Sequence, residues 1–369
     1  MPATPVVLNR RELACFPVTY ALAQSRWLEG LAANIELVKH HLKFPVGAQG
    51  PQYEELTTRV AWLGHEDASK VLVLIAGTNG VEGHVGSAVQ LDLWSRLEQG
   101  KLTLQEDIAI LMVHPLNPFG YAWSRRCDEQ GIDLNRNFVD FSLPLPSSDG
   151  YDLLRPQLSL AKTSSQRHKL FQEFVRDHGR QAFERALSGG QYVDPQGPFY
   201  GGDQAAHGRR VIEDIIERFQ LAKRHLTVID VHAGLGAFGH GEVICSHPLD
   251  SPAMIRAKQI YGASVTAPAL RDSSSVTKTG LLDHAWHRLM ARRGCFIALE
   301  FGSYGTDALF DVLLQEHADW NNESFLELDH PSSRAMREHF CPDDAYWREL
   351  VLIKSRQIIA QTLAGLTAP

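Results

Sequence analysis

The sequence predicts an α/β fold in which a central, mixed and mostly parallel sheet lies between two layers of helices. Apolar runs of strand length alternate along the chain with stretches of helical periodicity. The apolar runs are continuous rather than alternating, which is typical of strands buried on both faces. Helices must then cover both faces of the sheet, which gives a three-layer α/β/α arrangement.

Each predicted element has its own pattern. Continuous apolar residues, bounded by polar or glycine residues, predict strands at 71–76, 108–113, 226–231, 242–246 and 295–301. Apolar residues that recur every three or four positions predict helices at 27–42, 86–97, 211–219 and 346–363. These elements alternate over most of the chain, so we expect one domain over residues 1–369.

One long segment departs from this alternation. Residues 143–202 open with Pro-, Ser- and Gly-rich sequence, contain one helical stretch near 166–186, and return to turn-rich sequence. We interpret about 143–202 as an insertion that covers one end of the sheet.

Composition limits the classes of partner and the compartment. The 369 residues carry 36 Lys and Arg against 43 Asp and Glu, a net charge of −7, which argues against non-specific nucleic-acid binding. No apolar run reaches the roughly 18 residues that span a membrane, and no secretory signal is visible. The five cysteines are scattered without a C-x-x-C pair. We therefore expect reduced thiols, a cytoplasmic location, and neither a nucleic-acid nor a membrane partner. The oligomeric state is left open.

Polar side chains collect where the predicted strands end. Asn79 and Glu82 follow the first strand, His114 follows the second and His232 the third, while Glu300 lies near the end of the last. In open α/β sheets, ligands bind beyond the carboxyl ends of the strands. A buried carboxylate such as Glu300 is costly unless it is paired or functional. These strand ends therefore predict a functional site.

Five segments in order resemble motifs of the zinc carboxypeptidase superfamily. The loop 77–83, GTNGVEG, resembles the family's H-x-x-E metal loop, and 117–121, NPFGY, resembles its N-P-x-G-[YF] stretch. Arg126 followed by 131–138, GIDLNRNF, is similar to R…G-x-D-x-N-R-N-[FWY]. The segments 230–232, DVH, and 299–302, LEFG, resemble the strands that carry the second zinc histidine and the general-base glutamate.

A closer branch is also indicated. GTNGVEGHVGSAVQ, GGQYVDPQGPFYGG and DVHAGLGAFGHGE resemble a bacterial branch of uncharacterised zinc-peptidase-like proteins, related to the aspartoacylase and succinylglutamate desuccinylase group. The resemblance covers roughly residues 53–305.

The resemblance implies a fold, a reaction and roles for particular residues. The fold would be the carboxypeptidase-like, or phosphorylase/hydrolase-like, α/β/α fold. The reaction would be metal-dependent hydrolysis of an amide bond in a small substrate with a free carboxylate, such as a peptide or an N-acyl amino acid. One zinc ion would be held by residues at three positions, and four further residues would act on the substrate. The implied metal ligands are Glu82, His232 and Asn79; Glu300 would be the general base, Arg126 the oxyanion donor, and Asn135 and Arg136 the carboxylate-binding pair.

One of these positions departs from the family pattern. Asn79 stands where the family has its first zinc-binding histidine, and a carboxamide oxygen is a poorer zinc ligand than imidazole. His84 is two residues past Glu82, so on a helix its side chain would diverge from that of Glu82. Three interpretations stay open: weak coordination by Asn79, a metal-free relative, or an introduced substitution that inactivates the enzyme.

Two other functional classes are alternatives to the metal-dependent hydrolase. A non-catalytic binding protein on the same scaffold is favoured by Asn79, and the retained Glu300, Arg126 and Arg136 count against it. A serine or cysteine hydrolase has little support because the sequence contains no G-x-S-x-G elbow. Lys278 lies where the family often has a tyrosine that contacts substrate, and it is a weaker candidate for the pocket.

Overall fold

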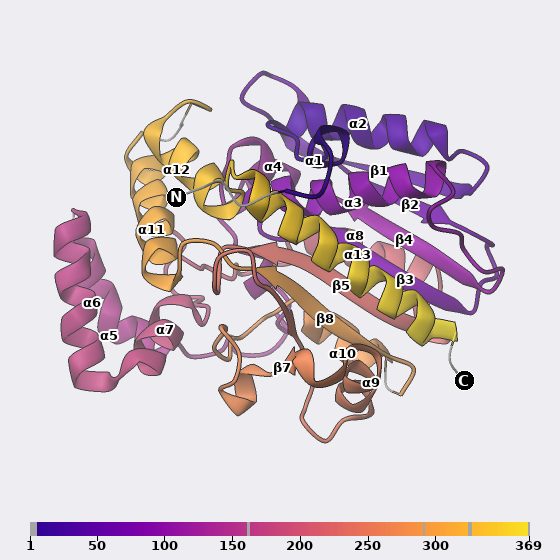
Figure 1. The fold of residues 1–369 in the computed structure, drawn as a ribbon. Helices are drawn as coiled ribbons and strands as arrows, with labels where there is room; N and C mark the ends of the chain where they lie inside the picture. Colours follow the sequence, from indigo (N-terminus) through magenta and orange to yellow (C-terminus); the bar gives the residue numbers. More distant parts are fainter. Residues whose placement is uncertain (1–5, 161–162, 291, 324–326, 368–369) are drawn as a thin grey trace.

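The computed structural model describes residues 6–160, 163–290, 292–323 and 327–367 (Figure 1). Its centre is an eight-stranded sheet with the order β1-β2-β4-β3-β5-β8-β6-β7. The four central strands β4, β3, β5 and β8 are parallel to one another, whereas β1 and β2 are antiparallel additions at one edge. At the other edge β6 is antiparallel to β8 and parallel to β7. The predicted mixed, mostly parallel sheet is confirmed. The strands are β1 (Val38–Gln49), β2 (Glu55–Leu63), β3 (Lys70–Ala76), β4 (Ile108–His114), β5 (His225–Ala233), β6 (Gly241–Ile244), β7 (Val265–Thr266) and β8 (Gly294–Phe301).

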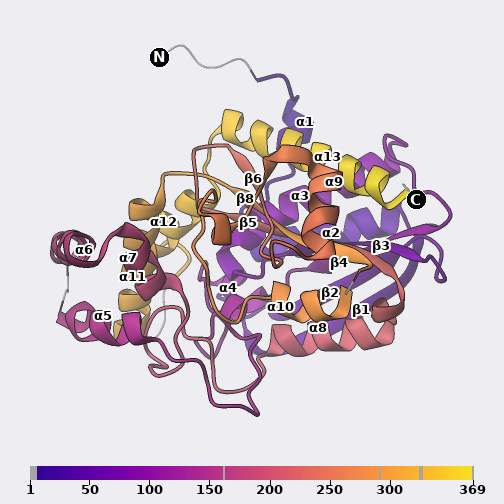
Figure 2. The same ribbon diagram turned by 90° about the horizontal axis from the view of Figure 1, so that it is seen from below.

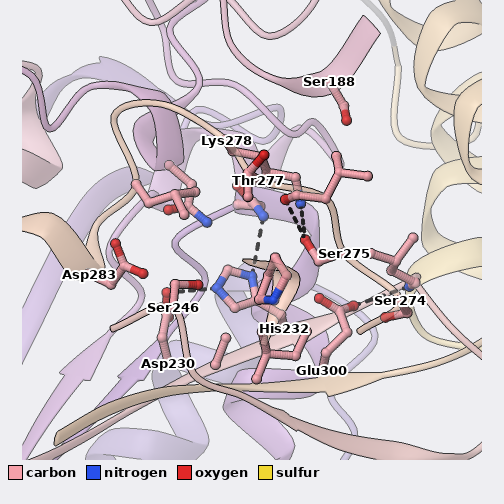
Figure 3. Close-up of a pocket in the computed structure, with 18 of the residues that line it drawn as sticks. Ser188, Asp230, His232, Ser246, Ser274, Ser275, Thr277, Lys278, Asp283 and Glu300 are labelled. Atoms are coloured by element: carbon pink, nitrogen blue, oxygen red, sulfur yellow. Dashed lines mark hydrogen bonds and ion pairs between the residues drawn. The ribbon is translucent and has the colours of Figure 1, made fainter. Parts of the chain in front are cut away.

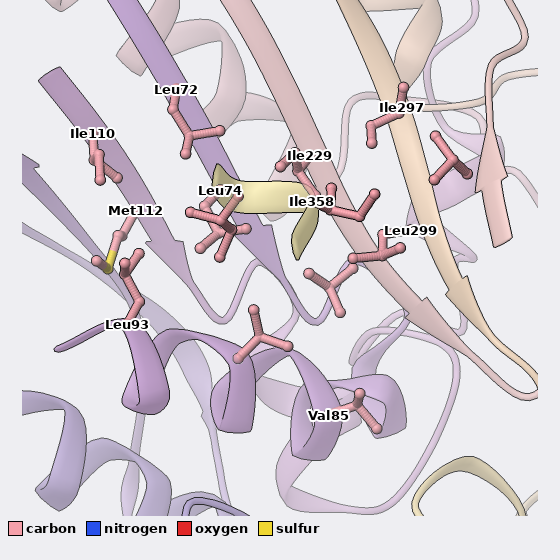
Figure 4. Packing of buried hydrophobic residues seen from close by; sticks show 14 of the residues in the cluster. Leu72, Leu74, Val85, Leu93, Ile110, Met112, Ile229, Ile297, Leu299 and Ile358 are labelled. Atoms are coloured by element: carbon pink, nitrogen blue, oxygen red, sulfur yellow. The ribbon is translucent and has the colours of Figure 1, made fainter. Parts of the chain in front are cut away.

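Helices cover both faces of this sheet, as predicted. On one face, α2 (Tyr20–Ala33), α3 (Gly83–Glu98), α9 (Pro252–Tyr261) and α13 (Ala345–Thr367) pack against the strands in one large apolar cluster (Figure 4). On the other face, α8 (His207–Arg218) and α10 (Asp283–Met290) pack in a second cluster. Figure 2 shows the sheet between these two layers. The central strands are buried on both faces, which is why their sequences are continuously apolar.

A third group of helices lies beyond one end of the sheet. It comprises α5 (Asp149–Leu160), α6 (Ser164–His178), α7 (Arg180–Ser188), α11 (Thr306–Glu323) and α12 (Pro331–Phe340). Figure 1 places them beside the carboxyl ends of β5 and β8. The short helices α1 (Arg10–Leu13) and α4 (Pro118–Ala122) complete the α-helices of the described ranges. Helices α5 to α7 fall within the predicted insertion; its treatment as part of one domain remains a prediction.

The helix predicted over 27–42 is wrong in its second half. Helix α2 ends at Ala33, and residues 38–42 belong to β1, where Leu42 pairs with Val60 of β2. The apolar spacing over 27–42 fits a helix locally, but pairing with β2 satisfies the backbone groups of this segment instead. Neither β1 nor β2 was predicted as a strand. The edge strand β1 is half-exposed and lacks a continuous apolar run, and in β2 the polar residues 57–59, TTR, interrupt the run.

The helical stretch predicted near 166–186 is two helices. Gly179 separates α6 from α7 and has a φ of 86°, a left-handed conformation that an α-helix does not contain. The five predicted strands and the helices at 86–97, 211–219 and 346–363 are confirmed, with ends that shift by a few residues.

Candidate active site

A cavity of about 290 Å³ lies at the carboxyl ends of β5 and β8, beside the loop after β3. All seven residues predicted from the sequence line this one cavity: Asn79, Glu82, Arg126, Asn135, Arg136, His232 and Glu300. Figure 3 shows His232 and Glu300 among the residues around it. The structure therefore brings together side chains from positions 79 to 300, and their individual roles remain predictions.

The floor of the cavity is a histidine held between two carboxylates. His232 Nδ1 lies 2.7 Å from Glu82 Oε2, and its Nε2 lies 2.7 Å from Asp230 Oδ2. Thr78 donates a hydrogen bond of 2.7 Å to the other oxygen of Asp230. Burial would lower the pKa of His232, but Asp230 and Glu82 outweigh it and raise that pKa well above its usual value. In this arrangement a protonated His232 offsets the charge of one of the two carboxylates, and the floor keeps a net negative charge.

The backbone explains why these groups meet. Asp230 and His232 are two residues apart on β5, so their side chains leave the same face of the strand. Glu82 ends a single 3₁₀ turn, Gly80–Glu82, that follows β3, and β3 is the parallel neighbour of β5. Gly80 allows this turn to lie against the backbone of Gly120, where a Cβ atom would approach within 2.2 Å.

Asn79 completes the floor and has one polar atom without a partner. Its Nδ2 donates 2.8 Å to Glu82 Oε1 and lies 3.3 Å from His232 Nδ1, while its buried Oδ1 has no hydrogen bond. The orientation of an amide group is an assignment based on hydrogen bonding. Turning the amide over would direct Oδ1 toward Glu82 and His232 Nδ1, and a cation between the three would then stabilise that orientation.

This donor set fits a divalent cation, but more weakly than the usual protein zinc site. It offers one imidazole nitrogen, one carboxylate and one carboxamide oxygen, whereas catalytic zinc sites usually have at least two nitrogen or sulfur ligands. Asp230 would fix the ring of His232 through Nε2, as carboxylates behind metal-binding histidines do. Within the described ranges, no group of three or more His, Cys, Asp or Glu residues is placed to hold a metal.

His84 does not replace the missing imidazole. It is buried in α3, its Nδ1 lies 2.9 Å from the carbonyl oxygen of Pro17, and its ring packs edge-on against Tyr121. Burial lowers the pKa of His84 to about 4, so it is neutral. It is also not among the residues that line the cavity, as expected from its position two residues past Glu82.

Glu300 extends the floor of the cavity onto the next strand, β8. In the register of β5 and β8 it pairs with His232. Its Oε1 accepts a hydrogen bond of 3.1 Å from the backbone N–H of Leu235. Burial, and then the negative charge of Glu82, raise the pKa of Glu300 to about 8. A carboxyl group with a pKa near neutrality is suited to accept and donate protons.

The wall of the cavity carries two arginines, of which Arg136 is buried and Arg126 is largely buried. Arg126 Nε donates 2.8 Å to Asp133, and its Nη1 lies 3.6 Å from Glu82 Oε1. Arg136 donates to the backbone oxygens of Ser188 and Asn135 at 2.6 Å each. Burial lowers the pKa of Arg136 to about 10, which still leaves it charged at neutral pH. Both guanidinium groups can therefore attract an anionic group of a ligand.

Asn135 is partly engaged by the protein itself. Its Oδ1 accepts a hydrogen bond of 2.9 Å from the backbone N–H of Leu282, which joins the 3₁₀ turn Leu134–Arg136 to the start of α10. Asp133 accepts from the N–H of Asn135 as well as from Arg126. Asp133 therefore ties Arg126 to the turn that carries Asn135.

The loop between β7 and α10 contributes more residues to the cavity than the sequence predicted. Ser274, Ser275, Thr277 and Lys278 of this loop all line the cavity. Lys278 Nζ donates a hydrogen bond of 2.5 Å to Ser275 Oγ (Figure 3). The segment 273–278, SSSVTK, is dense in hydroxyl groups next to a lysine, and this was the signal available in the sequence.

The architecture defines an α/β protein of the carboxypeptidase-like fold, and comparison with solved structures supports this. Carboxypeptidase A from Helicoverpa armigera matches with a TM-score of 0.54 and 11% identity over 94% of this chain and 73% of that chain. Bovine thrombin-activatable fibrinolysis inhibitor matches with a TM-score of 0.51 and 11% identity over 94% and 95%. An aspartoacylase family protein from Mesorhizobium loti matches with a TM-score of 0.37 and 18% identity over 78% and 67%. At such identities the first two similarities show the fold.

The chain belongs to the family described as "Protein of unknown function (DUF2817)", whose model matches residues 16–354. Comparison with curated proteins gave no match. None of the helices in the described ranges is both long and apolar enough to cross a membrane.

Proposed function

We propose that this protein is a metal-dependent hydrolase that cleaves an amide bond in a small substrate with a free carboxylate, such as a peptide or an N-acyl amino acid. The observation that carries the proposal is the convergence of His232 Nδ1, Glu82 and Asn79 within 2.7–3.3 Å, with Glu300 on the adjacent strand. The fold shared with a carboxypeptidase supports the same class of reaction.

Glu82, His232 and Asn79 are the residues that would hold the cation, zinc or another divalent ion. When bound, it would polarise the scissile carbonyl and lower the pKa of a water molecule. To bind it, His232 must give up the proton that it carries between Glu82 and Asp230. Asn79 must turn its Oδ1 inward.

The remaining residues have roles that follow from their charge and place. Glu300 accepts the proton of the attacking water and passes it to the nitrogen of the leaving amine. Arg126, anchored by Asp133, donates to the oxygen on which negative charge develops. Arg136 and Asn135 bind the carboxylate of the substrate, because a guanidinium matches the two oxygens of a carboxylate.

A non-catalytic binding protein is the second candidate, and Asn79 is the observation that favours it. Without a cation, protonated His232 already offsets part of the negative charge of Glu82 and Asp230. The arginine wall would still bind carboxylates in that case.

A metal-reconstitution assay separates the two functions. Protein stripped with a chelator would be supplied with Zn²⁺, Mn²⁺ or Co²⁺ and offered a panel of dipeptides and N-acyl amino acids. We expect hydrolysis with at least one of these metals and none in the stripped protein. If panel compounds bind, as measured by calorimetry, and none is cleaved with any metal, the binding-protein function is correct. In either case Arg136→Met should weaken binding of the carboxylate-bearing compounds.

A further inference from the structure

The cavity contains a second pair of reactive groups that the proposed hydrolysis does not use. Ser275 Oγ and Lys278 Nζ are 2.5 Å apart, and both residues line the cavity. A hydroxyl group in contact with an amine is the arrangement by which a lysine can activate a serine as a nucleophile. Figure 3 shows the hydroxyl of Ser275 turned toward Lys278.

The loop that carries this pair is fixed at both of its ends. At one end, Ser274 Oγ and its backbone N–H donate to the carboxylate of Glu242 on β6, at 2.5 and 3.2 Å. At the other end, the N–H of Leu282 donates 2.9 Å to Asn135. These flanking hydrogen bonds therefore fix the segment in which Ser275 and Lys278 meet.

The surroundings of Lys278 favour the free amine. Burial, then the positive charges of Arg136 and Arg126, lower the pKa of Lys278 to about 7, against the opposing effect of Glu300 and Asp133. These four charged groups are the ones that act on it most strongly. A substantial fraction of Lys278 is then neutral at neutral pH and can accept the proton of a hydroxyl group.

We propose that Ser275 is a nucleophile and Lys278 its general base, in an acyl-transfer activity that is independent of any metal ion. The substrate class is a carboxylic ester or an activated amide whose acyl group fits beside the arginine wall. The spacing S-x-x-K, from Ser275 to Lys278, is one that known serine–lysine hydrolases use. In this protein the pair lies in an irregular loop, and for that reason the missing G-x-S-x-G elbow does not exclude a serine nucleophile.

The reaction has two balanced steps. In the first, Ser275 Oγ bonds to the carbonyl carbon and its proton passes to Lys278 Nζ. The bond from that carbon to the leaving oxygen or nitrogen breaks, and the leaving group takes the proton from Lys278. In the second, water adds to the acyl carbon and gives a proton to Lys278, the Oγ–carbon bond breaks, and Oγ recovers the proton. Arg126, which lines the same cavity, would stabilise the negative oxygen in both steps.

Acylation of the full-length protein by p-nitrophenyl acetate tests the proposal. The protein would be treated with chelator first, so that the metal-dependent function cannot contribute. We expect a burst of p-nitrophenol and a single acetyl group, located on Ser275 by peptide mass spectrometry. Ser275→Ala should abolish both. Ser246→Ala, which removes another hydroxyl group from the same cavity, should leave both unchanged.

Two lysine variants distinguish a base from a structural contact. Lys278→Met and Lys278→Arg should each slow acetylation by about 100-fold or more, since a general base typically contributes at least that factor. If Lys278 had only a structural role, Lys278→Arg would keep the acetylation rate of wild type, because arginine keeps the charge and the hydrogen-bond donors. The proposal is overturned if no adduct forms on Ser275, if Lys278 itself is the acetylated residue, or if Lys278→Arg reacts at the wild-type rate. These outcomes leave the metal-dependent function untouched, because the proposed hydrolysis assigns no step to Ser275 or Lys278.

Discussion

The floor and the wall of the cavity are built in different ways. In the floor, Asp230, His232 and Glu300 come from two adjacent strands whose register fixes their relative positions. In the wall, Arg126 and Arg136 come from the connection between α4 and α5, and Lys278 comes from that between β7 and α10. Their partners are Asp133, the backbone oxygen of Ser188 at the end of α7, and Ser275. The floor is acidic and suited to a cation, whereas the wall is basic and suited to an anion.

This difference predicts how substitutions in the floor and in the wall affect catalysis and stability. Strand pairing holds the floor through many backbone hydrogen bonds, so that replacing one floor side chain should alter chemistry more than folding. The wall depends on a few contacts of buried charged groups, such as Arg126 with Asp133. The loss of one partner should therefore alter folding as well. The three predictions below test this contrast, from the largest expected effect to the smallest.

Glu300→Gln tests the floor. The amide keeps the size of the side chain but cannot accept a proton, so hydrolysis of a substrate identified in the panel should fall by about 10²–10⁴-fold. Affinity for the metal, measured by calorimetry, should stay within a few-fold of wild type because Glu300 is not one of the proposed ligands. An unchanged rate of hydrolysis in this variant would show that another group is the base.

Asp133→Asn tests the wall. Asp133 is buried, and its carboxylate is 2.8 Å from Arg126, so the variant leaves a largely buried cation without its partner. We expect the free energy of unfolding to fall by about 3 kcal/mol, measured by denaturant titration. Asp214→Asn is the matched control, because it breaks an exposed pair with Arg218 and should cost less than about 1 kcal/mol. Equal losses in the two variants would contradict the buried-pair explanation.

The pH dependence of stability gives a smaller effect for each unit of pH. In metal-free protein the pKa of Glu300 is raised from 4.5 to about 8, so the folded state binds more protons than the unfolded state between these values. The stabilisation due to protonated Glu300 is complete below pH 4.5 and is lost as the pH rises through about 8.

Relative to wild type, Glu300→Gln should therefore become more stable as the pH increases from 5 to 9, by roughly 1 kcal/mol for each pH unit up to about pH 8. Denaturant titrations of both proteins at several pH values would measure it. A difference in stability that does not vary with pH would show that Glu300 has an ordinary pKa in the folded protein.

The sequence predicted the central strands and the residues that lie at their ends. Continuous apolar runs such as 71–76 and 226–231 mark strands buried on both faces, and parallel strands bring their carboxyl ends to one edge. Asn79, Glu82, His232 and Glu300 could therefore be expected near one another before any coordinates were known.

The edge strands and the loop contacts could not be predicted in the same way. Strand β1 is half-exposed, and its pairing with β2 is a long-range contact that local periodicity does not encode. The position of Lys278 depends on how loop 273–282 meets Glu242 and Asn135, which are distant in sequence. The orientation of the Asn79 amide could not be predicted either. The sequence shows that the usual histidine ligand is replaced, but it does not show the unpaired Oδ1 that could bind a metal ion.

Anomalous diffraction from crystals of the wild-type protein soaked in Mn²⁺ or Zn²⁺ tests the central claim most directly. We predict one peak at the floor of the cavity, within bonding distance of His232 Nδ1, Glu82 and Asn79 Oδ1, and a stronger peak at the same place in Asn79→His at equal metal concentration. The claim would be contradicted if neither protein bound a cation there, or if the peak lay away from His232.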